Sequence, residues 1–398
     1  MQLLKRIATT VGLIVLAVAG TATASANAST GSDVVGHVYV NDNSAVANTV
    51  AAFDRHGDGT LTPTRGSPFS TGGSGTGTHI GSQGALQMTE DGRFLLAVDT
   101  GSNQISVLHI NSDGTLWAVP GGLVSSGGVQ PVSIAVHAMA ARGDHSGSSP
   151  HLVYVANAGA GGTNYTGFTL SSQGRLRPLA GSTISLPAGS QPGDVLFNGD
   201  GHLLAGTRVA TSLIDSFAVG RDGRLAAAPG SPFPAQGLGP FGSQFRPTNV
   251  RQLFVSNAHN PAPNSGTVSA FRVAADATLT SIGSSPFPNN QTAPCWIEIS
   301  HDGQILFTVN TAVPSISRYS IAADGSLTLL GSTPFKPGPV ALAPQDARLG
   351  PAGDTLWVVD TGGRAVSAFA VHGGDLSELS SSPTPLPAGS APFGIVVT

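Results

Sequence analysis

One landmark recurs seven times along this chain and constrains its fold more than any other feature. A short polar turn followed by leucine appears as GDGTL, SDGTL, SQGRL, RDGRL, ADATL, ADGSL and HGGDL. The leucines of these turns are Leu61, Leu116, Leu176, Leu225, Leu279, Leu327 and Leu376. Successive copies therefore lie 48 to 60 residues apart. Such a period indicates that one supersecondary unit is repeated seven times.

Each repeat also contains β-rich runs at matching places. One run ends in a polar residue, as in LVYVAN and LWVVD, and a second run follows it, as in QISVLHI and AVSAFAV. After the landmark comes a loop, which carries a Pro-Phe step in four repeats, and then a further strand such as CWIEIS. No segment after the N-terminal thirty residues has a sustained helical period. The repeats predict an all-β fold, a seven-bladed β-propeller of four-stranded blades.

The two ends of the mature chain fit a closed ring. The first repeat begins inside a blade with GHVYVND, and the chain finishes with APFGIVVT, which has the character of an innermost strand. The segment from Phe393 to Thr398 is therefore expected to complete the first blade and close the ring.

The first thirty residues have the features of a secretory signal peptide. Lys5 and Arg6 precede an apolar run from Ile7 to about Ala19, and small residues with an Ala-x-Ala site ending at Ala28 follow. We expect cleavage near Ala28, a signal peptide at 1–28, and a single propeller domain at 29–398. The apolar run is short for a membrane span, so the mature protein is expected to be secreted, with no membrane span.

The composition excludes several classes of partner. Only 10% of residues are charged and the net charge is −4, which gives no basis for binding nucleic acid or an anionic membrane. The single cysteine, Cys295, allows no intramolecular disulfide and is interpreted as a small buried apolar residue. A closed propeller has no sheet edge that demands a partner, so a monomer is expected.

The repeat units resemble a known family. VYVANAGAGGTNYTGFTL and LFVSNAHNPAPNSGTVSAFRV are similar to YVTN-type repeats. Together with the DG-x-L turns, they resemble the seven-bladed lactonase-like propellers, which include 6-phosphogluconolactonases and muconate-lactonizing enzymes. The resemblance covers nearly the whole mature chain. It implies a small-molecule site at the central channel, on the face where the innermost strands begin, with a lactone or carbohydrate-like ligand.

The family's catalytic residues do not carry over to this chain. Relatives have a Pro-His step and an Arg-His step at the start of innermost strands, and a Glu after the Asn of YV-x-N. The corresponding places here read Pro131-Val132, Pro240-Phe241, Asn157-Ala158 and Asn257-Ala258. If the chain is a lactone hydrolase, it needs a different base and a different partner for the oxyanion.

Charged residues inside the expected innermost strands supply the candidates. Counting two and four positions from the opening proline gives Asp194, Trp296, Glu298, Asp346 and Arg348, with Gln87 as the counterpart in the second repeat. Burying a charge is costly unless the charge is paired. Glu298 and Arg348 fall at equivalent places in neighbouring repeats and can form an ion pair. They form either a structural link or, with Asp194 and Asp346, a catalytic set with a carboxylate base and Arg348 at the oxyanion.

A second polar group follows the β-rich runs: Asp42, Asp99, Asn157, Asn257, Asn310 and Asp360. Asp and Asn at such places cap tight turns, but they lie on the expected ligand face and are also candidates for ligand contact. His259, two residues after Asn257, joins them. The eleven histidines show no metal-ligand spacing, so neither a metal nor another cofactor is expected.

Three functions remain open at this point. The first is a secreted lactone hydrolase (a carboxylic ester hydrolase), and the second is a non-catalytic propeller that binds a carbohydrate, a cell-wall fragment or a protein. The third comes from two Asp-Thr-Gly triplets, at Asp99 and Asp360, which are also the signature of a pepsin-like aspartic protease. Because both triplets occupy the same place in their repeats, we interpret them as two copies of one turn.

Overall fold

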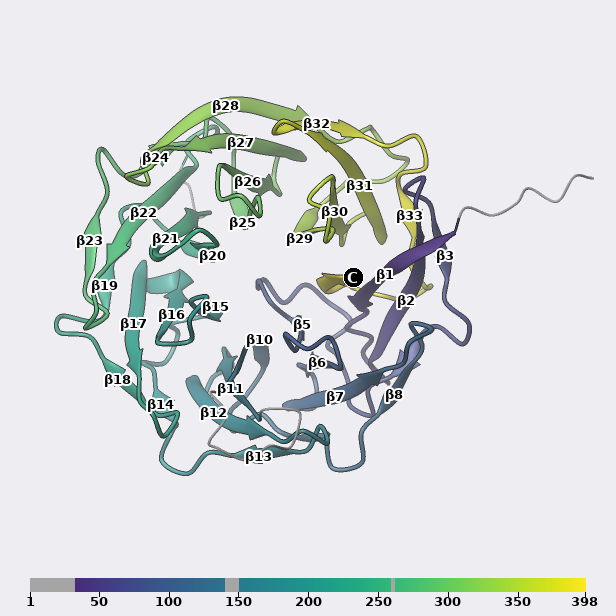
Figure 1. The fold of residues 1–398 in the computed structure, drawn as a ribbon, viewed down its shortest axis with the longest axis horizontal. Helices are drawn as coiled ribbons and strands as arrows, with labels where there is room; N and C mark the ends of the chain where they lie inside the picture. Colours follow the sequence, from purple (N-terminus) through teal and green to yellow (C-terminus); the bar gives the residue numbers. More distant parts are fainter. Residues whose placement is uncertain (1–32, 140–149, 259–261) are drawn as a thin grey trace, which may run out of the picture. The chain divides into compact units, whose positions relative to one another are not determined.

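Seven antiparallel sheets are arranged around a central axis, as Figure 1 shows. The structure is a computed structural model, and it describes residues 33–139, 150–258 and 262–398. Six sheets contain five strands and one contains four. We number the sheets as blades 1 to 7 in chain order. The predicted seven-bladed, all-β propeller is confirmed.

The strands form four layers from the axis outward. The innermost strands are β34 (Phe393–Val397), β5 (Leu86–Met88), β10 (Pro131–Ala138), β15 (Pro192–Phe197), β20 (Pro240–Arg246), β25 (Pro294–Ile299) and β29 (Pro344–Leu349). The second strands are β1 (Val34–Asn41), β6 (Phe94–Asp99), β11 (His151–Asn157), β16 (Leu203–Arg208), β21 (Asn249–Asn257), β26 (Ile305–Asn310) and β30 (Thr355–Asp360).

The outer half of each blade begins with a third strand: β2 (Thr49–His56), β7 (Gln104–Ile110), β12 (Asn164–Leu170), β17 (Leu213–Val219), β22 (Thr267–Val273), β27 (Ser315–Ile321) and β31 (Ala365–His372). The fourth strands are β3 (Leu61–Pro63), β8 (Leu116–Ala118), β13 (Leu176–Pro178), β18 (Leu225–Ala227), β23 (Leu279–Ser281), β28 (Leu327–Pro334) and β32 (Asp375–Glu378). Each fourth strand begins at or next to a landmark leucine.

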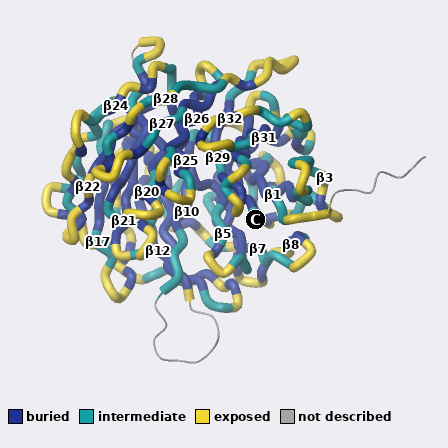
Figure 2. Tube along the Cα trace, turned by 45° about the horizontal axis from the view of Figure 1, so that its top comes forward, coloured by how far each residue is buried: buried dark blue, intermediate teal, exposed yellow. Residues whose placement is uncertain are grey.

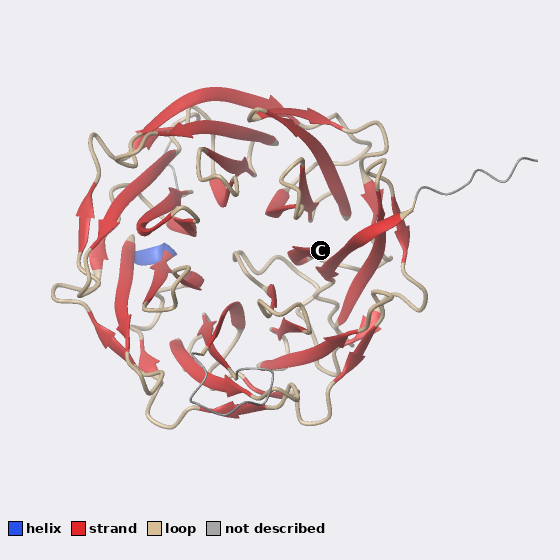
Figure 3. Ribbon diagram, in the orientation of Figure 1, coloured by secondary structure: helices blue, strands red, loops and turns tan. Residues whose placement is uncertain are grey.

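A fifth, two-residue strand pairs with the third strand in six blades, and sequence reasoning did not predict it. These strands are β4 (Phe69–Ser70), β9 (Val124–Ser125), β14 (Ile184–Ser185), β19 (Phe233–Pro234), β24 (Phe287–Pro288) and β33 (Thr384–Pro385). Three of them begin at the phenylalanine of a Pro-Phe step. In blade 6, the long strand β28 covers this place instead. Figure 3 shows the strands in red with one helical turn, η1 (Val209–Thr211).

The C-terminal strand closes the ring. Strand β34 pairs antiparallel with β1, with Tyr39 opposite Val396, and Arg55 of β2 donates to the Thr398 carbonyl at 2.8 Å. Blade 1 is thus built from both ends of the described chain, as predicted. Figure 2 shows that the burial is continuous through the inner strands, while exposed residues lie mainly in the turns.

Hydrophobic side chains pack between blades. Trp357 of β30 and Val38 of β1 lie in one cluster, and Phe254 of β21 and Ile297 of β25 lie in another. Such face-to-face packing of neighbouring sheets buries apolar area at about 25 cal/mol per Å² and holds the ring together. No helix among the described residues is long and apolar enough to span a membrane.

Each of the three residues in an Asp-Thr-Gly triplet has a structural role. Asp99 ends β6 and is fully buried, accepting hydrogen bonds from Thr71 and Asn48 of blade 1 and from Ser106 of its own sheet. Thr100 donates to the Pro131 carbonyl at 2.7 Å and so links blade 2 to blade 3. A side chain at Gly101 would meet the Gly75 carbonyl oxygen at 2.1 Å.

The second triplet repeats this arrangement in blade 7. The Asp360 carboxylate accepts from the Ala343 amide at 2.7 Å, and Thr361 donates to the Pro392 carbonyl at 2.8 Å. Each aspartate is thus engaged where its own blade meets a neighbouring segment, whereas an aspartic protease needs two carboxyls that share a proton. The triplets are one propeller turn that occurs twice.

Candidate functional site

A loop from blade 2 fills the centre of the ring. The segment 76–84, which precedes β5, leaves the blade and reaches the axis among the innermost strands (Figure 1). We call this segment the plug. Its sequence, TGTHIGSQG, is rich in small residues that allow close approach to the surrounding strands.

Gln83 joins the plug to three blades. Its amide N–H donates to the Gly193 carbonyl at 3.0 Å, and its side-chain Nε2 donates to the Ser243 carbonyl at 2.8 Å. Its Oε1 accepts from the Ile297 amide at 3.1 Å. The carboxamide therefore bonds backbone groups of two inner strands, β20 and β25.

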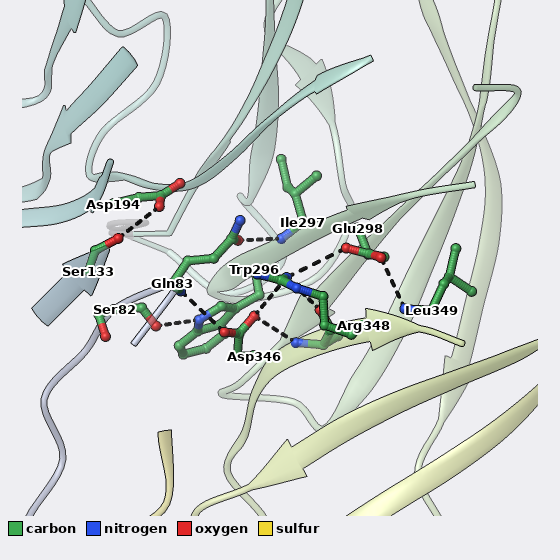
Figure 4. A network of polar contacts seen from close by, with 12 residues as sticks. Ser82, Gln83, Ser133, Asp194, Trp296, Ile297, Glu298, Asp346, Arg348 and Leu349 are labelled. Atoms are coloured by element: carbon green, nitrogen blue, oxygen red, sulfur yellow. Dashed lines mark hydrogen bonds and ion pairs between the residues drawn. The ribbon is translucent and has the colours of Figure 1, made fainter. Parts of the chain in front are cut away.

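The residues on either side of Gln83 join two further inner strands. The Trp296 indole Nε1 donates to the Ser82 carbonyl at 2.6 Å. The Gly84 N–H donates to Asp346 Oδ2 at 3.2 Å, and its carbonyl accepts from the Ile134 N–H at 2.9 Å. Figure 4 shows Ser82 and Gln83 lying among the charged side chains of the channel. The plug is thus an integral part of the channel wall.

Two cavities lie at opposite ends of the innermost strands. The start-side cavity, about 340 Å³, is bordered by residues at strand beginnings, such as Pro192 and Phe241. The end-side cavity, about 370 Å³, is bordered by residues at strand ends, such as Phe197 and Arg246. Gln83 borders the second cavity, and Thr76 to Gly81 border the first. The plug therefore stands between them.

The charged candidates gather at the end-side cavity. Asp194, Glu298 and Arg348 border this cavity, and none of them borders the start-side cavity. The family resemblance implied a site on the opposite face. The strand register contributes to the difference, because the five inner strands that open with proline (β10, β15, β20, β25 and β29) each have an irregularity just after it, as between Pro294 and Trp296. Counting from the proline predicts which side chains are central but not the end to which they open.

Glu298 and Arg348 form the predicted pair. Glu298 Oε2 lies 3.6 Å from Arg348 Nη1, and Glu298 Oε1 accepts from the Leu349 amide at 3.0 Å. The Glu298 residue is 6% exposed, and its Oε2 is buried without a hydrogen-bond partner. Arg348 is bound through Nη1 alone, to Glu298, to Asp346 Oδ1 at 3.3 Å and to the Ala347 carbonyl at 2.8 Å. Figure 4 shows this arrangement.

Asp194 is held differently from Glu298. Its Oδ2 accepts from the Ser243 amide at 2.9 Å and from the Ser243 hydroxyl at 2.7 Å, while its Oδ1 accepts from the Ser133 hydroxyl at 3.2 Å. Both carboxylate oxygens are therefore occupied, and the group links blades 3, 4 and 5. This makes Asp194 an anchor of the cavity wall.

Asp346 lies behind the cavity with no exposed surface. Its Oδ2 accepts from the Gly84 amide of the plug, and its Oδ1 accepts from the Ala347 amide at 2.9 Å. Because the same Oδ1 faces Arg348, Asp346 positions the guanidinium.

Burial dominates the ionisation of this cluster. It raises the pKa of Asp194 to about 7, against the stabilising hydrogen bonds from Ser243. It raises the pKa of Glu298 to about 7, although the Arg348 charge and the Leu349 amide oppose the rise. Burial lowers the pKa of Arg348, but Asp346 and Glu298 hold it above its usual value. At neutral pH the arginine is charged, and Glu298 is poised between its acid and its base forms.

The predicted ring of Asp and Asn residues lies inside the blades. Asn157 donates to the Asn164 side chain at 2.8 Å, Asn257 donates to Ser269 at 2.9 Å, and Asn310 donates to Ser317 at 2.9 Å. None of these described side chains, nor those of Asp42, Asp99 and Asp360, borders either channel cavity. The structure gives them the capping role.

The remaining candidates divide between the plug and the cavity. Trp296 is 1% exposed and packs edge-on against Phe241, with ring centroids 5.2 Å apart. Gln87 borders the end-side cavity. His259 lies outside the described residues. Cys295 is buried, and burial raises the pKa of its thiol to about 12, consistent with an unreactive side chain.

Sequence reasoning missed the serines and the plug. Ser133 and Ser243 gave no signal because serine is common throughout this chain. Gln83 was the available clue, since a long amide stands alone in a run of small residues.

Comparison with known proteins supports the fold and the family resemblance. Residues 245–396 match the family "Lactonase, 7-bladed beta-propeller". Among solved structures, the chain is similar to the periplasmic gluconolactonase PpgL of Pseudomonas aeruginosa, with 15% identity, a TM-score of 0.68, and coverage of 91% of this chain and 99% of that one. No curated protein sequence matches the chain.

Two further structures have the same architecture. A candidate 6-phosphogluconolactonase of Bacteroides fragilis aligns with 17% identity and a TM-score of 0.67, over 92% of this chain and 98% of that one. A protein from Lactobacillus plantarum aligns with 18% identity and a TM-score of 0.68, over 91% and 99%. At these identities the structural likeness concerns the fold. The predicted seven-bladed propeller is confirmed, and the match over residues 245–396 supports the resemblance to the lactonase family.

Proposed function

Because the chain is a lactonase-like seven-bladed β-propeller, we propose that it hydrolyses a small uncharged lactone in the end-side cavity. In this proposal Glu298 is the general base and Arg348 stabilises the oxyanion. The observation that carries the proposal is the Oε2 of Glu298, which is buried beside Arg348 at the cavity wall without a hydrogen bond of ordinary geometry, while the Gln244 side chain favours its anionic form. A base needs such an unspent oxygen, and those of Asp194 and Asp346 are occupied.

The chemistry follows from these positions. Water beside Glu298 gives a proton to Oε2 while its oxygen bonds to the lactone carbonyl carbon. The carbonyl electron pair moves onto oxygen, where the Nε and Nη2 groups of Arg348 can donate to it. When the ring C–O bond breaks, the leaving oxygen takes the proton back from Glu298. The product is a hydroxy acid, and the base is regenerated.

The charge of the cavity supports an uncharged substrate. Two carboxylates, Asp194 and Glu298, face two guanidiniums, Arg348 and Arg246, so the lining has no excess positive charge. The Arg246 guanidinium is already engaged in hydrogen bonds, since it donates to the Gly303 carbonyl at 2.7 Å and to the Gln252 side chain at 2.9 Å. A phosphorylated lactone would bring about two further negative charges to a cavity lining whose open guanidinium groups, on Arg348, are already assigned to the oxyanion.

The proposed setting is outside the cytoplasm, after removal of residues 1–28. This part of the proposal rests on the basic, apolar and small-residue regions of the N-terminal sequence. The N-terminal segment lies outside the described residues. N-terminal sequencing of the protein recovered from culture medium tests it, and a chain that keeps residues 1–28 inside the cell would contradict it.

A hydrolysis screen tests the activity. We expect turnover of glucono-δ-lactone or of a simple δ- or γ-lactone, with slower turnover of 6-phosphogluconolactone. Glu298→Gln should lower kcat/KM by about 10²–10⁴-fold, the usual contribution of a general base. Arg348→Lys, which keeps a charge but changes its geometry, should retain more activity than Arg348→Met.

Glu90→Gln is the matched control, because Glu90 has a half-exposed side chain, pairs with His137 and does not border this cavity. If Glu298→Gln and Glu90→Gln behave alike, the assignment of the base is wrong. If no lactone turns over but an unreactive lactam binds, the protein is a binding propeller.

A further inference from the structure

A third cavity, of about 390 Å³, lies on blade 5 away from the channel. It is bordered by residues in or next to the second, third and fourth strands of this blade, and by none of an innermost strand. The lining residues are Asn249, Arg251, Gln252, Arg272, Val273, Ala274 and Thr280. Two of them are arginines and none is acidic, so the lining carries two positive charges with no opposing carboxylate. We call this cavity the blade 5 pocket.

The antiparallel ladder of blade 5 places polar side chains next to one another in this pocket. Arg272 of β22 lies opposite Gln252 of β21 and opposite Thr280 of β23. Residues directly opposite one another in a ladder point to the same face of the sheet, so these three side chains form a row. Arg251, one position before Gln252 in β21, adds the second guanidinium to the lining.

Neither guanidinium is engaged by the described part of the chain. Arg251 Nη1 is buried without a hydrogen-bond partner. Arg272 is exposed, and its side chain forms no ion pair or hydrogen bond with a described residue. Arg318 also has a buried nitrogen without a partner, but its Nη1 pairs with Asp375. Arg251 is distinguished by its position, since it borders a cavity that a second unpaired arginine also borders.

Two aspartates lie in neighbouring turns, but neither borders the pocket. Asp276 Oδ1 accepts from the Thr278 amide at 3.1 Å, and Asp324 Oδ1 accepts from the Ser326 amide at 2.9 Å. The hydrogen bonds from Ser326 are the main cause that lowers the pKa of Asp324, and the charge of Arg272 makes a smaller contribution. Both carboxylates are therefore held in their own turns, and the two guanidiniums remain available to an anion.

Blade 3 provides a comparison within the same chain. Arg177 of blade 3 lies opposite a threonine across the third and fourth strands, as Arg272 of blade 5 does. On the second strand, His151 of blade 3 takes the place that Arg251 has in blade 5. Burial lowers the pKa of His151, so this side chain is neutral at pH 7. Blade 3 thus has one positive charge at this place, and blade 5 has two.

We propose that the blade 5 pocket binds a phosphate group through Arg251 and Arg272. A guanidinium can donate two parallel N–H bonds to phosphate oxygens, and two guanidiniums match the charge of about −1.5 to −2 that a phosphate monoester carries near pH 7. Asn249 Oδ1 accepts from the Arg251 backbone amide at 3.2 Å, which leaves Nδ2 as a further donor. The phosphate belongs either to a free ion or to a phosphate-bearing polymer, and titration separates the two sources.

Isothermal titration calorimetry of the purified protein tests this proposal. The probes are inorganic phosphate and long-chain polyphosphate, with acetate as the singly charged counterpart. We expect inorganic phosphate to bind about tenfold more tightly than acetate, because a single carboxylate satisfies only one guanidinium. Tighter binding of polyphosphate would identify a polymer as the source, and similar binding would identify the free ion. If neither phosphate probe binds, or if acetate binds as tightly as phosphate, the proposal is wrong.

Three arginine variants locate the binding. Arg251→Gln and Arg272→Gln each remove one guanidinium and should weaken phosphate binding about 10- to 100-fold, the effect of losing a charge-assisted hydrogen-bonding group. Arg272→Lys keeps the charge but loses the planar fork, so its affinity should lie between those of Arg272→Gln and the parent protein. Because Arg272 is exposed, its two variants should melt like the parent protein when phosphate is absent.

Arg177→Gln is the matched control, because it makes the same charge change at an exposed arginine in the corresponding ladder of blade 3. It should bind phosphate like the parent protein. Phosphate should raise the melting temperature of the parent protein and of Arg177→Gln, but raise that of Arg272→Gln much less. Equal phosphate affinity in Arg272→Gln and Arg177→Gln would overturn the site. Glu298→Gln should bind phosphate normally, so loss of hydrolysis and loss of phosphate binding are separate results.

Discussion

The two cavities are made from the same innermost strands and yet have opposite chemistry. At the strand starts, the lining is neutral, with free carboxamides and an apolar wall. At the strand ends, the lining is charged: it contains two carboxyl groups, those of Glu298 and Asp194, and the guanidinium of Arg348. The repeat alone would give both ends similar access to the axis. The plug creates the difference, because Ser82 to Gly84 occupy the level between them.

The comparison also concerns buried polarity. Around the strand-start face, the Asn caps donate hydrogen bonds within their blades, as Asn310 does to Ser315 and Ser317, while the Asn157 and Asn310 Oδ1 atoms are buried without a hydrogen bond. At the strand-end face, Glu298 Oε2 is likewise buried without one. What distinguishes Glu298 is its position, since it borders a cavity and lies beside Arg348, whereas none of the caps borders either cavity.

The largest expected effect comes from Trp296, which joins the plug residue Ser82 to Phe241 at the start-side cavity. Trp296→Ala removes a buried indole between Phe241 and Ser82 and should cost about 3–5 kcal/mol of unfolding free energy. It should also weaken the separation of the cavities. Trp296→Phe keeps the packing and loses the bond to the Ser82 carbonyl, so its cost should be about 1–2 kcal/mol. Urea unfolding measures the free energy of unfolding of both variants. Equal stability of the two variants would contradict the packing role of the indole ring.

The second prediction is a pH profile that belongs to one cavity only. Glu298 must be ionised to act as the base, and its pKa is raised to about 7. Well below that value, kcat/KM should fall about tenfold per pH unit, and from pH 7, where about half of Glu298 is ionised, to pH 5 it should fall about 50-fold. A kcat/KM that stays constant between pH 7 and pH 5 would contradict the assignment of Glu298 as the base.

How far the sequence could predict this division depends on what each signal encodes. The landmark spacing predicted seven blades, and the final strand predicted the closure, because both depend on a period that all blades share. Residue types inside the inner strands predicted the charged cluster, including the pairing of Glu298 with Arg348. These features are local or repeated, so one chain contains enough information to find them.

Local and repeated sequence features could not predict the plug, nor the end of the channel to which the charged cluster opens. The plug is a single departure from the repeat, and its contacts join Gln83 to Ser243 and Ile297, which are 160 and 214 positions away. Depth along the channel depends on irregularities such as that between Pro344 and Ala347, which shift a strand without changing its residue types. A sequence alone places such a side chain at the axis but not at one end of it.

The third prediction concerns stability and follows from the same carboxyls. The pKa of Asp194 is raised from 3.8, and that of Glu298 from 4.5, to about 7 in both cases. Between about pH 4.5 and 7 the folded protein therefore binds more protons than the unfolded chain, and stability falls as pH rises. The melting temperature should be at least about 3 °C lower at pH 8 than at pH 5.

Glu298→Gln tests the source of this pH dependence, because it removes one of the two carboxyls. The difference in melting temperature between pH 5 and pH 8 should shrink in this variant and persist in Glu90→Gln. A melting temperature that rises from pH 5 to pH 8 in the parent protein would show that these carboxyls are stabilised as anions.

The smallest expected effect uses the threonines of the two Asp-Thr-Gly turns. Thr100 borders the start-side cavity and Thr361 does not, yet each donates to the carbonyl of a proline at the start of the next innermost strand: Pro131, the first residue of β10, and Pro392, just before β34. Thr→Val at either place keeps the shape, loses that bond, and should cost about 1 kcal/mol by chemical denaturation. The two losses should be equal, because the two turns make the same bond. A loss of stability in one variant alone would show that the two turns are not equivalent.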